Sequence, residues 1–167
     1  LKLQRLKREF IPNSITSLKR DLRLTKLPRR IECYDISNIQ GTDTVASMVV
    51  FVDGRPKKGD YRKFKIQSVL NEVGRPDDFA SMKEVVFRRY QRLLEEQIPM
   101  PQLIIIDGGK GQLSAALESI EMLGLTGKTT LVGLAKNQEE LFFSGDSTSK
   151  QLSWNSESLK LIRLIRD

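Results

Sequence analysis

Residues 103–112 read Leu-Ile-Ile-Ile-Asp-Gly-Gly-Lys-Gly-Gln, and this stretch decides the kind of fold that the chain can form. The consecutive large apolar residues at 103–106 are typical of a short strand in a sheet covered on both faces. Gly108 and Gly109 predict a tight turn directly after that strand. Apolar residues then recur every three or four positions until Gly124, which predicts a helix. A buried strand followed by such a helix indicates an α/β protein.

Three predicted strands lie upstream of this stretch. Apolar runs at 31–36 and 45–52 predict two strands, with a turn at 38–44 between them. Asp53-Gly54 favours a hairpin turn after the second strand. Residues 61–67 alternate polar and apolar side chains, as a half-buried strand does. We therefore expect three antiparallel strands in a row.

Helices alternate with strands in the rest of the chain. An amphipathic helix is predicted to end near Gln97, with an apolar face made of Phe79, Met82, Val86, Tyr90 and Leu93. Residues 130–134 predict a buried strand, 141–143 a brief pairing, and residues from Ser158 onward a last helix. The order βββαβαβα implies an α/β fold in which a mixed five-stranded sheet carries helices on both faces. The strand at 31–36 is expected beside the strand at 103–106.

The composition excludes several kinds of active site. The chain has 167 residues, enough for one domain, and no apolar run long enough to span a bilayer. Its single cysteine, Cys33, excludes an internal disulfide and a cysteine-based zinc site, and a reducing cytoplasmic setting is expected. The absence of histidine excludes Ser-His-Asp catalysis. A metal would have to be held by oxygen atoms, which favours Mg²⁺ or Mn²⁺.

Positive charge is concentrated at the start of the chain. Residues 1–30 hold ten Lys or Arg against Glu9 and Asp21, a net charge of +8, whereas the whole chain carries +7. Such a segment favours a polyanionic partner, although a solvated helix face or a linker would have the same composition. We expect a basic, helical flanking segment at 1–26 and one domain at 27–167. Because the chain starts at Leu1 and its last apolar pattern stops without Gly or Pro, we also expect both ends to be cuts in a longer protein.

Two aspartates are attached to strands that otherwise contain core residues. Asp35 lies in the strand at 31–36, and Asp107 ends the strand at 103–106. Burying an unpaired carboxylate is unfavourable, and neighbouring strands lie roughly 4.8 Å apart, so the two could share one cation. The alternative is that Asp35 caps the turn at Ser37-Asn38 and that Asp107 caps the following helix.

Other charged residues have simpler explanations. Asp77 and Asp78 stand where acids satisfy the free N–H groups of a helix, although a capping box at 81–84 offers a second helix start. The glycine-rich turn lacks the spacing of a Walker A loop. The residues that could contact phosphate are Lys110, Lys136 after the strand at 130–134, and one basic helix face comprising Lys83, Arg88, Arg89 and Arg92. Such a face is usually only solvated.

Several ordered motifs resemble one known family. They include Glu-Cys-Tyr-Asp-Ile-Ser-Asn at 32–38, Asp-Asp-Phe-Ala-Ser-Met at 77–82, the stretch at 103–112, and Gly-Leu-Ala-Lys at 133–136. Together with shorter matches at 46–51 and 61–64, they make the chain from about residue 27 onward similar to the C-terminal endonuclease domain of the UvrC family. These are the excinuclease ABC subunits C of bacterial nucleotide excision repair.

The resemblance implies a ribonuclease H-like fold and a metal-dependent DNA endonuclease that makes the 5′ incision beside a lesion during the DNA damage response. The family's catalytic, metal-binding acids fall on Asp35, Asp78 and Asp107. The implied partners are damaged duplex DNA and the UvrB subunit, with no membrane and no small-molecule cofactor. Mg²⁺ or Mn²⁺ is the implied cofactor.

The family has parts that this chain does not contain. A second nuclease domain and a helix-hairpin-helix module are absent, and the chain ends at Arg166-Asp167, just inside a family motif whose catalytic histidine would follow. We therefore expect a domain truncated at its C-terminal end that binds metal but nicks DNA weakly by itself. The alternatives are a ribonuclease H-like domain that binds nucleic acid without cutting it, or more remotely a nucleotide-binding module.

Overall fold

The computed structural model describes residues 11–39, 43–67, 77–135, 140–143, 150–153 and 156–167. Its centre is a mixed eight-stranded sheet in the order β3-β2-β1-β5-β6-β7-β8, with β4 also paired to β2. The strands are β1 (Arg30–Ile39), β2 (Asp43–Val52), β3 (Arg55–Pro56), β4 (Arg62–Gln67), β5 (Leu103–Asp107), β6 (Thr130–Leu134), β7 (Glu140–Phe143) and β8 (Lys150–Gln151). The predicted five strands are present, the brief pairing predicted at 141–143 is confirmed as β7, and the two-residue strands β3 and β8 are additional.

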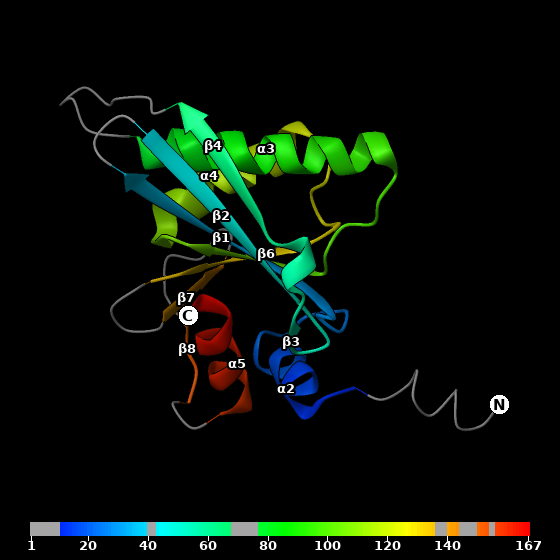
Figure 1. The fold of residues 1–167 in the computed structure, drawn as a ribbon. Coiled ribbons are helices and arrows are strands. Elements are labelled where there is room, and N and C mark those ends of the chain that lie inside the picture. Colours follow the sequence, from blue (N-terminus) through cyan, green and yellow to red (C-terminus); the bar gives the residue numbers. More distant parts are fainter. Residues whose placement is uncertain (1–10, 40–42, 68–76, 136–139, 144–149, 154–155) are drawn as a thin grey trace.

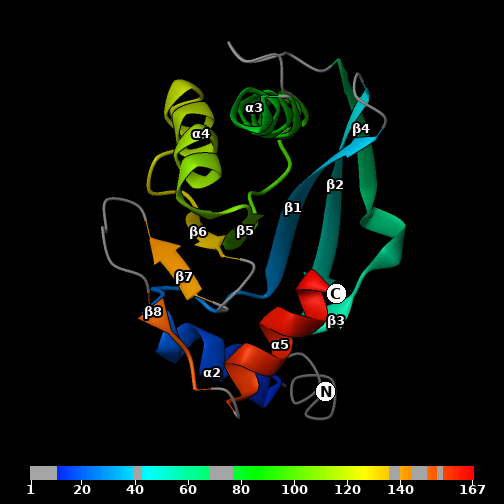
Figure 2. The same cartoon turned by 90° about the vertical axis from the view of Figure 1, so that its left-hand side faces the viewer.

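Helices cover both faces of the sheet, as the order of elements predicted (Figure 1). They are α2 (Asn13–Asp21), α3 (Asp78–Glu96), α4 (Gly109–Met122) and α5 (Glu157–Arg166), with the short 3₁₀ helix η1 at Lys58–Asp60. Figure 2 shows α3 and α4 packed side by side on one face and α2 with α5 on the other. None of the described helices is both long and apolar enough to cross a membrane.

The central strands bury both of their faces because side chains alternate along each strand. In β5, Ile104 and Ile106 belong to the core under α3 and α4, whereas Leu103 and Ile105 belong to the core under α2 and α5. All five residues of this strand are buried. The continuous apolar run therefore predicted its position correctly.

The antiparallel part of the sheet differs from the prediction in detail. Asp53 and Gly54 form the expected tight turn, with φ of 51° and 81°. The strand after that turn is only the two-residue β3, and η1 then leads to β4, which pairs with β2 from Asp43 to Met48. The turn predicted at 38–44 is wrong in extent, because β1 and β2 continue pairing as far as Ile39↔Asp43. Gly41 itself lies outside the described residues.

Helix ends follow local hydrogen bonding. The carboxylate of Asp77 accepts a hydrogen bond from the backbone N–H of Ala80 at 3.0 Å and caps α3. Ser81 lies inside α3, so the alternative capping box is wrong. The helix ends at Gln97, which has a left-handed φ of 57°. The N-terminal cap of α5 is Ser156, whose hydroxyl accepts from the N–H of Leu159.

Residues from the predicted flanking segment contribute to the core. Ile15 and Leu18 of α2 are completely buried, and Leu22 is nearly so. All three pack in one cluster with Ile162 and Ile165 of α5. The domain boundary at residue 26 remains a prediction, but α2 packs against the sheet as part of the same fold.

A buried polar network joins β1 to α3. Glu32 is 0% exposed, and its Oε1 accepts a hydrogen bond of 2.6 Å from the Tyr90 hydroxyl. The Tyr34 hydroxyl donates to the Tyr90 oxygen at 2.9 Å. The other carboxylate oxygen, Oε2, lies 2.8 Å from Arg30 Nε and 3.4 Å from an Arg89 Nη. This network fixes α3 over the first strand.

Candidate functional site

Asp35 and Asp107 are brought together by the register of two neighbouring strands. β1 and β5 run parallel, and Asp35 is the direct partner of Asp107. Partners in register point to the same face of a sheet, and neighbouring strands lie about 4.8 Å apart. The predicted adjacency of these two strands is therefore confirmed, with both aspartates on one face.

That face is the one covered by α2 and α5. Along β1, Asp35 alternates with Ile31 and Cys33, and along β5, Asp107 alternates with Leu103 and Ile105. Those four residues belong to the core cluster under α2 and α5. Asp107 is 7% exposed and Asp35 is half-buried, so the pair lies at the end of this core.

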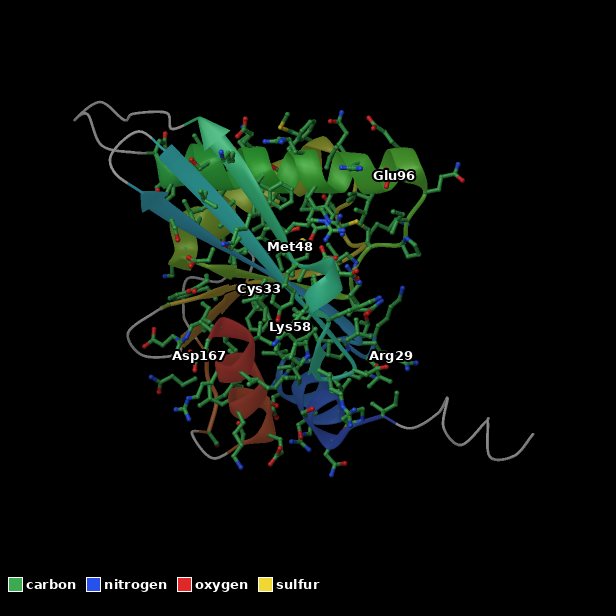
Figure 3. The ribbon with its side chains drawn as sticks, viewed as in Figure 1. Arg29, Cys33, Met48, Lys58, Glu96 and Asp167 are labelled. Atoms are coloured by element: carbon green, nitrogen blue, oxygen red, sulfur yellow. The ribbon has the colours of Figure 1, made fainter. Side chains whose placement is uncertain are left out.

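The guanidinium of Arg166 is a positive charge close to this pair of aspartates. Burial raises the pKa of the Cys33 thiol, and the negative charges of Asp107 and Asp35 raise it further, whereas the Arg166 guanidinium lowers it. Both carboxylates and the last turn of α5 therefore act on the same buried atom. Figure 3 shows Cys33 within the sheet and Asp167 directly after α5.

The alternative explanations for the aspartates have different outcomes. The N-cap position of α4 is occupied by Gly108, which has no side chain to accept a hydrogen bond. The alternative that the Asp107 carboxylate satisfies the first turn of that helix is not tested by the described geometry. At α3 the capping residue is Asp77, which leaves Asp78 as the first residue of the helix. Nothing in the described geometry tests whether Asp35 caps the turn at Ser37-Asn38.

Asp78 belongs to the layer on the other face of the sheet. Its helix, α3, buries its apolar side chains in the cluster on the opposite face of the sheet. The next residue, Phe79, lies directly over Gly111, because a Cβ added at Gly111 would be 2.4 Å from the Phe79 Cζ. This contact holds the start of α3 against the start of α4, two residues after Gly109. Within the described ranges, no three acidic, thiol or imidazole side chains form a metal-binding group, so a ligand role for Asp78 remains a prediction.

The basic residues predicted to contact phosphate are dispersed. Lys110 is exposed in the first turn of α4, with its Nζ 5.1 Å from the centre of the Phe142 ring. Arg88 is exposed, whereas Arg89 is engaged by the buried Glu32. Lys136 lies outside the described residues.

The prediction of one basic face on α3 is wrong for Lys83, whereas the three arginines lie within about 100° of one another around the helix axis. Lys83 pairs with Glu118 of α4, Arg88 reaches the carbonyl of Lys65 on β4, and Arg92 pairs with Glu96. The reason is helical geometry, because Lys83 and Arg88 are about 140° apart around the helix axis at 3.6 residues per turn.

Sequence reasoning missed two residues near the site. Arg166 was absent from the predicted site because a basic residue in the last turn of an amphipathic helix usually only complements the helix dipole. Phe79 was assigned to the apolar face of α3, but its side chain is 55% exposed. Its position two residues after the capping Asp77 could have indicated a helix start, where an apolar side chain has little core to enter.

Comparisons with known proteins agree on one family. Residues 19–167 match the model described as the UvrC RNase H endonuclease domain. The UvrABC system protein C of Flavobacterium johnsoniae is 57% identical over 153 residues, which cover 92% of this chain and 25% of that protein. The homologue from Carboxydothermus hydrogenoformans is 44% identical over 100% of this chain and 28% of its own length. The chain thus spans about a quarter of the length of these relatives.

Solved structures give more distant matches. Endonuclease V of Ciona intestinalis, in complex with a DNA that contains inosine, has a TM-score of 0.45 and 18% identity, over 81% of this chain and 55% of that one. The catalytic domain of human endonuclease V has a TM-score of 0.46 and 21% identity, over 98% of this chain and 63% of its own.

Proposed function

The chain belongs to the family of UvrC RNase H endonuclease domains, and we propose that it hydrolyses a phosphodiester bond of damaged DNA. The observation that carries this proposal is the register pairing of Asp35 with Asp107 on one face of the sheet. Two carboxylates fixed side by side at the end of a buried core are unfavourable unless a cation compensates them.

The donor atoms at this edge suit a hard divalent cation. Both are carboxylate oxygens, and the chain contains no histidine that could favour Zn²⁺. Mg²⁺ in particular is commonly held by one or two protein carboxylates, with substrate phosphate and water completing its coordination. We assign Asp35 and Asp107 as the ligands, with Asp78 as a third. When bound, Mg²⁺ or Mn²⁺ supplies an activated water and neutralises the charge that develops on the phosphate.

Each neighbouring residue has a distinct task in this proposal. Asp35 and Asp107 hold the cation in a fixed position because they are part of paired strands. Arg166 offsets part of their negative charge, and Lys110, exposed at the start of α4, attracts the DNA phosphate. The Phe79–Gly111 contact sets how closely Asp78 approaches the strand ends.

The family extends the proposal to the whole protein. We propose that the chain contributes the 5′ incision in nucleotide excision repair, acts on damaged duplex DNA with the UvrB subunit, and works in the cytoplasm. The relatives are called UvrABC system protein C, a name that describes a component of a multi-subunit system.

The first experiment measures metal binding through stability. Wild-type protein should gain thermal stability from Mn²⁺, by about 2.7 kcal/mol at a metal concentration one hundred times the Kd. Asp35→Asn and Asp107→Asn should remain folded without metal and should gain much less, because each change removes a ligand charge at nearly constant shape. Glu95→Gln, which removes an exposed charge on α3, serves as the matched control and should gain as much as the wild type. Equal metal-induced shifts in all four proteins would refute the assignment.

The second experiment measures cutting. Full-length protein that carries Asp35→Asn or Asp107→Asn, mixed with its partner subunit and lesion-containing DNA, should lose the metal-dependent 5′ nick while still binding DNA. If both variants nick at the wild-type rate, this edge of the sheet is not the catalytic centre.

A further inference from the structure

A small polar pocket lies at the edge of the sheet opposite the aspartates. Its lining comes from the segments that precede three parallel strands: residues 24–26 before β1, 100–102 before β5 and 127–130 before β6. Its volume is about 80 Å³, which is room for several waters and therefore for a small anion. We propose that this amino-edge pocket binds a phosphate group.

The charged side chains that line the pocket are all positive. Lys26 and Lys128 line it, and no acidic residue does. Neither lysine forms an ion pair with any residue in the described part of the chain. A neighbouring, larger pocket shows the contrast, because its four arginines are accompanied by Asp60 and by Glu96 at the end of α3 (Figure 3). In that pocket Arg30 pairs with Asp60 and Arg92 pairs with Glu96, whereas no acidic residue lines the amino-edge pocket.

Two neutral side chains of the pocket, Thr129 and Gln102, can donate hydrogen bonds to a ligand. The Thr129 Oγ1 atom is buried and has no hydrogen-bond partner in the described part of the chain. The Oε1 of Gln102 already accepts from the backbone N–H of Arg30 at 2.8 Å, so the donor end of that amide is left for another group. A buried hydroxyl without a partner is unfavourable by about 1–3 kcal/mol. Phosphate oxygens are acceptors, and they would satisfy two ammonium groups, one hydroxyl and one amide at once.

The backbone holds these groups in place. The N–H of Thr130 donates to the carbonyl of Gln102 at 3.2 Å, and the N–H of Lys128 donates to the carbonyl of Leu125 at 2.9 Å. Gly127, with φ of 82°, allows the turn that presents Lys128 and Thr129. The pocket is therefore preformed on the same strands that carry the candidate metal site.

The register separates this pocket from the aspartates. Leu103 pairs with Thr130 at one end of β5, and Asp107 pairs with Leu134 at the other. Four residues of strand span roughly 13 Å, about four base-pair rises of 3.4 Å. A phosphate in the pocket is therefore distinct from one held by Asp35 and Asp107, and this inference does not depend on metal binding or cutting.

The test uses the metal-free 167-residue chain and sodium phosphate as the probe. In amide NMR spectra, phosphate should cause saturable shifts at Lys128, Thr129 and Thr130, beyond those that sodium chloride causes at the same ionic strength. The double variant Lys26→Gln/Lys128→Gln should lose them. Lys63→Gln/Lys65→Gln on β4 removes the same charge elsewhere and should keep them. The proposal is overturned if phosphate gives no saturable shifts, or if the pocket variant binds as the wild type does.

A variant that preserves charge separates a built site from simple attraction. Thr129→Val removes the hydroxyl at nearly constant shape, so it should weaken phosphate binding several-fold while leaving the fold as stable as before or more so. Unchanged phosphate affinity in this variant would overturn the assignment of Thr129.

A competition arm then identifies the source of the phosphate. If a short single-stranded oligonucleotide displaces phosphate and binds more weakly to the lysine double variant, the ligand of the pocket is a backbone phosphate of nucleic acid. Displacement by a mononucleotide but not by the oligonucleotide identifies a free phosphate compound. Either result supports the pocket, and loss of metal binding in a separate assay would affect only the proposed function.

Discussion

Glu32 is a completely buried acid whose charge is compensated from several sides. Arg30 and Arg89 both contact Oε2, and the Tyr90 hydroxyl donates to Oε1. Removing one partner from such a network leaves the remaining charge buried with fewer hydrogen bonds, which is more unfavourable than losing an exposed pair. The free energy of unfolding should therefore depend on each tyrosine hydroxyl in this network.

We expect Tyr90→Phe to lower the free energy of unfolding by about 1–3 kcal/mol, because a hydrogen bond of 2.6 Å to a buried carboxylate is lost. Urea denaturation measures the change. Tyr61→Phe is the matched control, since Tyr61 is half-buried and its hydroxyl forms no hydrogen bond in the described part of the chain. Equal stabilities of the two variants would show that the network contributes little.

The two buried tyrosines also predict a response to alkaline pH. Burial raises the pKa of Tyr34 and of Tyr90 well above the ordinary value of 10.0, and the nearby Glu32 charge raises both further. A group whose pKa is raised in the folded state contributes stability that is complete below its unfolded pKa and is lost as pH rises above it. Stability should therefore fall from about pH 10 upward.

Absorbance at the phenolate band, compared with circular dichroism, measures this effect. Tyr34 and Tyr90 should ionise together with unfolding, and Tyr90→Phe should remove part of the coincident signal. Ionisation of both tyrosines while the dichroism spectrum stays native would contradict the expected cause.

At the scale of helices, the Phe79–Gly111 contact joins the start of α3 to the start of α4. The Phe79 ring occupies the space where a Gly111 side chain would stand. An alanine at Gly111 should gain up to about 1 kcal/mol of helix propensity, but it must displace the ring, so the single change should be close to neutral. In a Phe79→Ala background the same change should be stabilising.

A double-mutant cycle of Phe79→Ala and Gly111→Ala should therefore give a coupling energy of about 1 kcal/mol in urea denaturation. Gly59→Ala provides the control, because a Cβ there would contact nothing, and its combination with Phe79→Ala should be additive. Additivity in both cycles would mean that the Phe79 ring moves freely and does not position the start of α3.

The sequence predicted elements best where one pattern dominates. The strand predicted at residues 130–134 is confirmed at both of its ends, because β6 is a short apolar strand in the covered centre of the sheet. The start of α4 at Gly109 could not be predicted from periodicity, since Gly109, Lys110 and Gly111 have no apolar pattern and helix formation there depends on the preceding strand. The two-residue strands β3 and β8 are defined only by their partners, so no local pattern could predict them.

The candidate site was predictable in part for the same reason. Asp35 and Asp107 stand out because each is a charge in an apolar strand, and the order of elements implies that those strands are neighbours. Arg166 approaches through the packing of α5, and Glu32 resembles an exposed residue in a strand until its partners on α3 are known. Such long-range pairings are set by tertiary structure, which a single sequence does not contain.

At the scale of the molecule, the sheet separates two cores of different construction. The core under α3 and α4 is formed by helices that cross over between strands, whereas the other core joins α2, near the start of the described chain, to α5 at its end. Removing all of residues 1–30 would therefore remove Ile15, Leu18 and Leu22 from that second core. The basic charge of this segment must be tested without deleting α2.

Neutralising the charges before α2 provides that test. Residues 1–10 contain Lys2, Arg5, Lys7 and Arg8, and changing these four to Gln leaves every buried residue of α2 in place. If they contact DNA phosphates, non-specific affinity should fall, and the slope of log K against log salt should become shallower by up to roughly 3–4 units, since each contact contributes about 0.9.

The control changes Lys58, Lys63, Lys65 and Lys160 to Gln, which lowers the net charge equally at exposed positions elsewhere. Fluorescence anisotropy with an undamaged duplex over a range of salt concentrations measures both slopes. A larger loss of affinity and a shallower salt slope in the first variant than in the control assign DNA contact to the leading segment. Equal slopes in the two variants would show that only the overall charge matters and that the leading residues are a solvated extension.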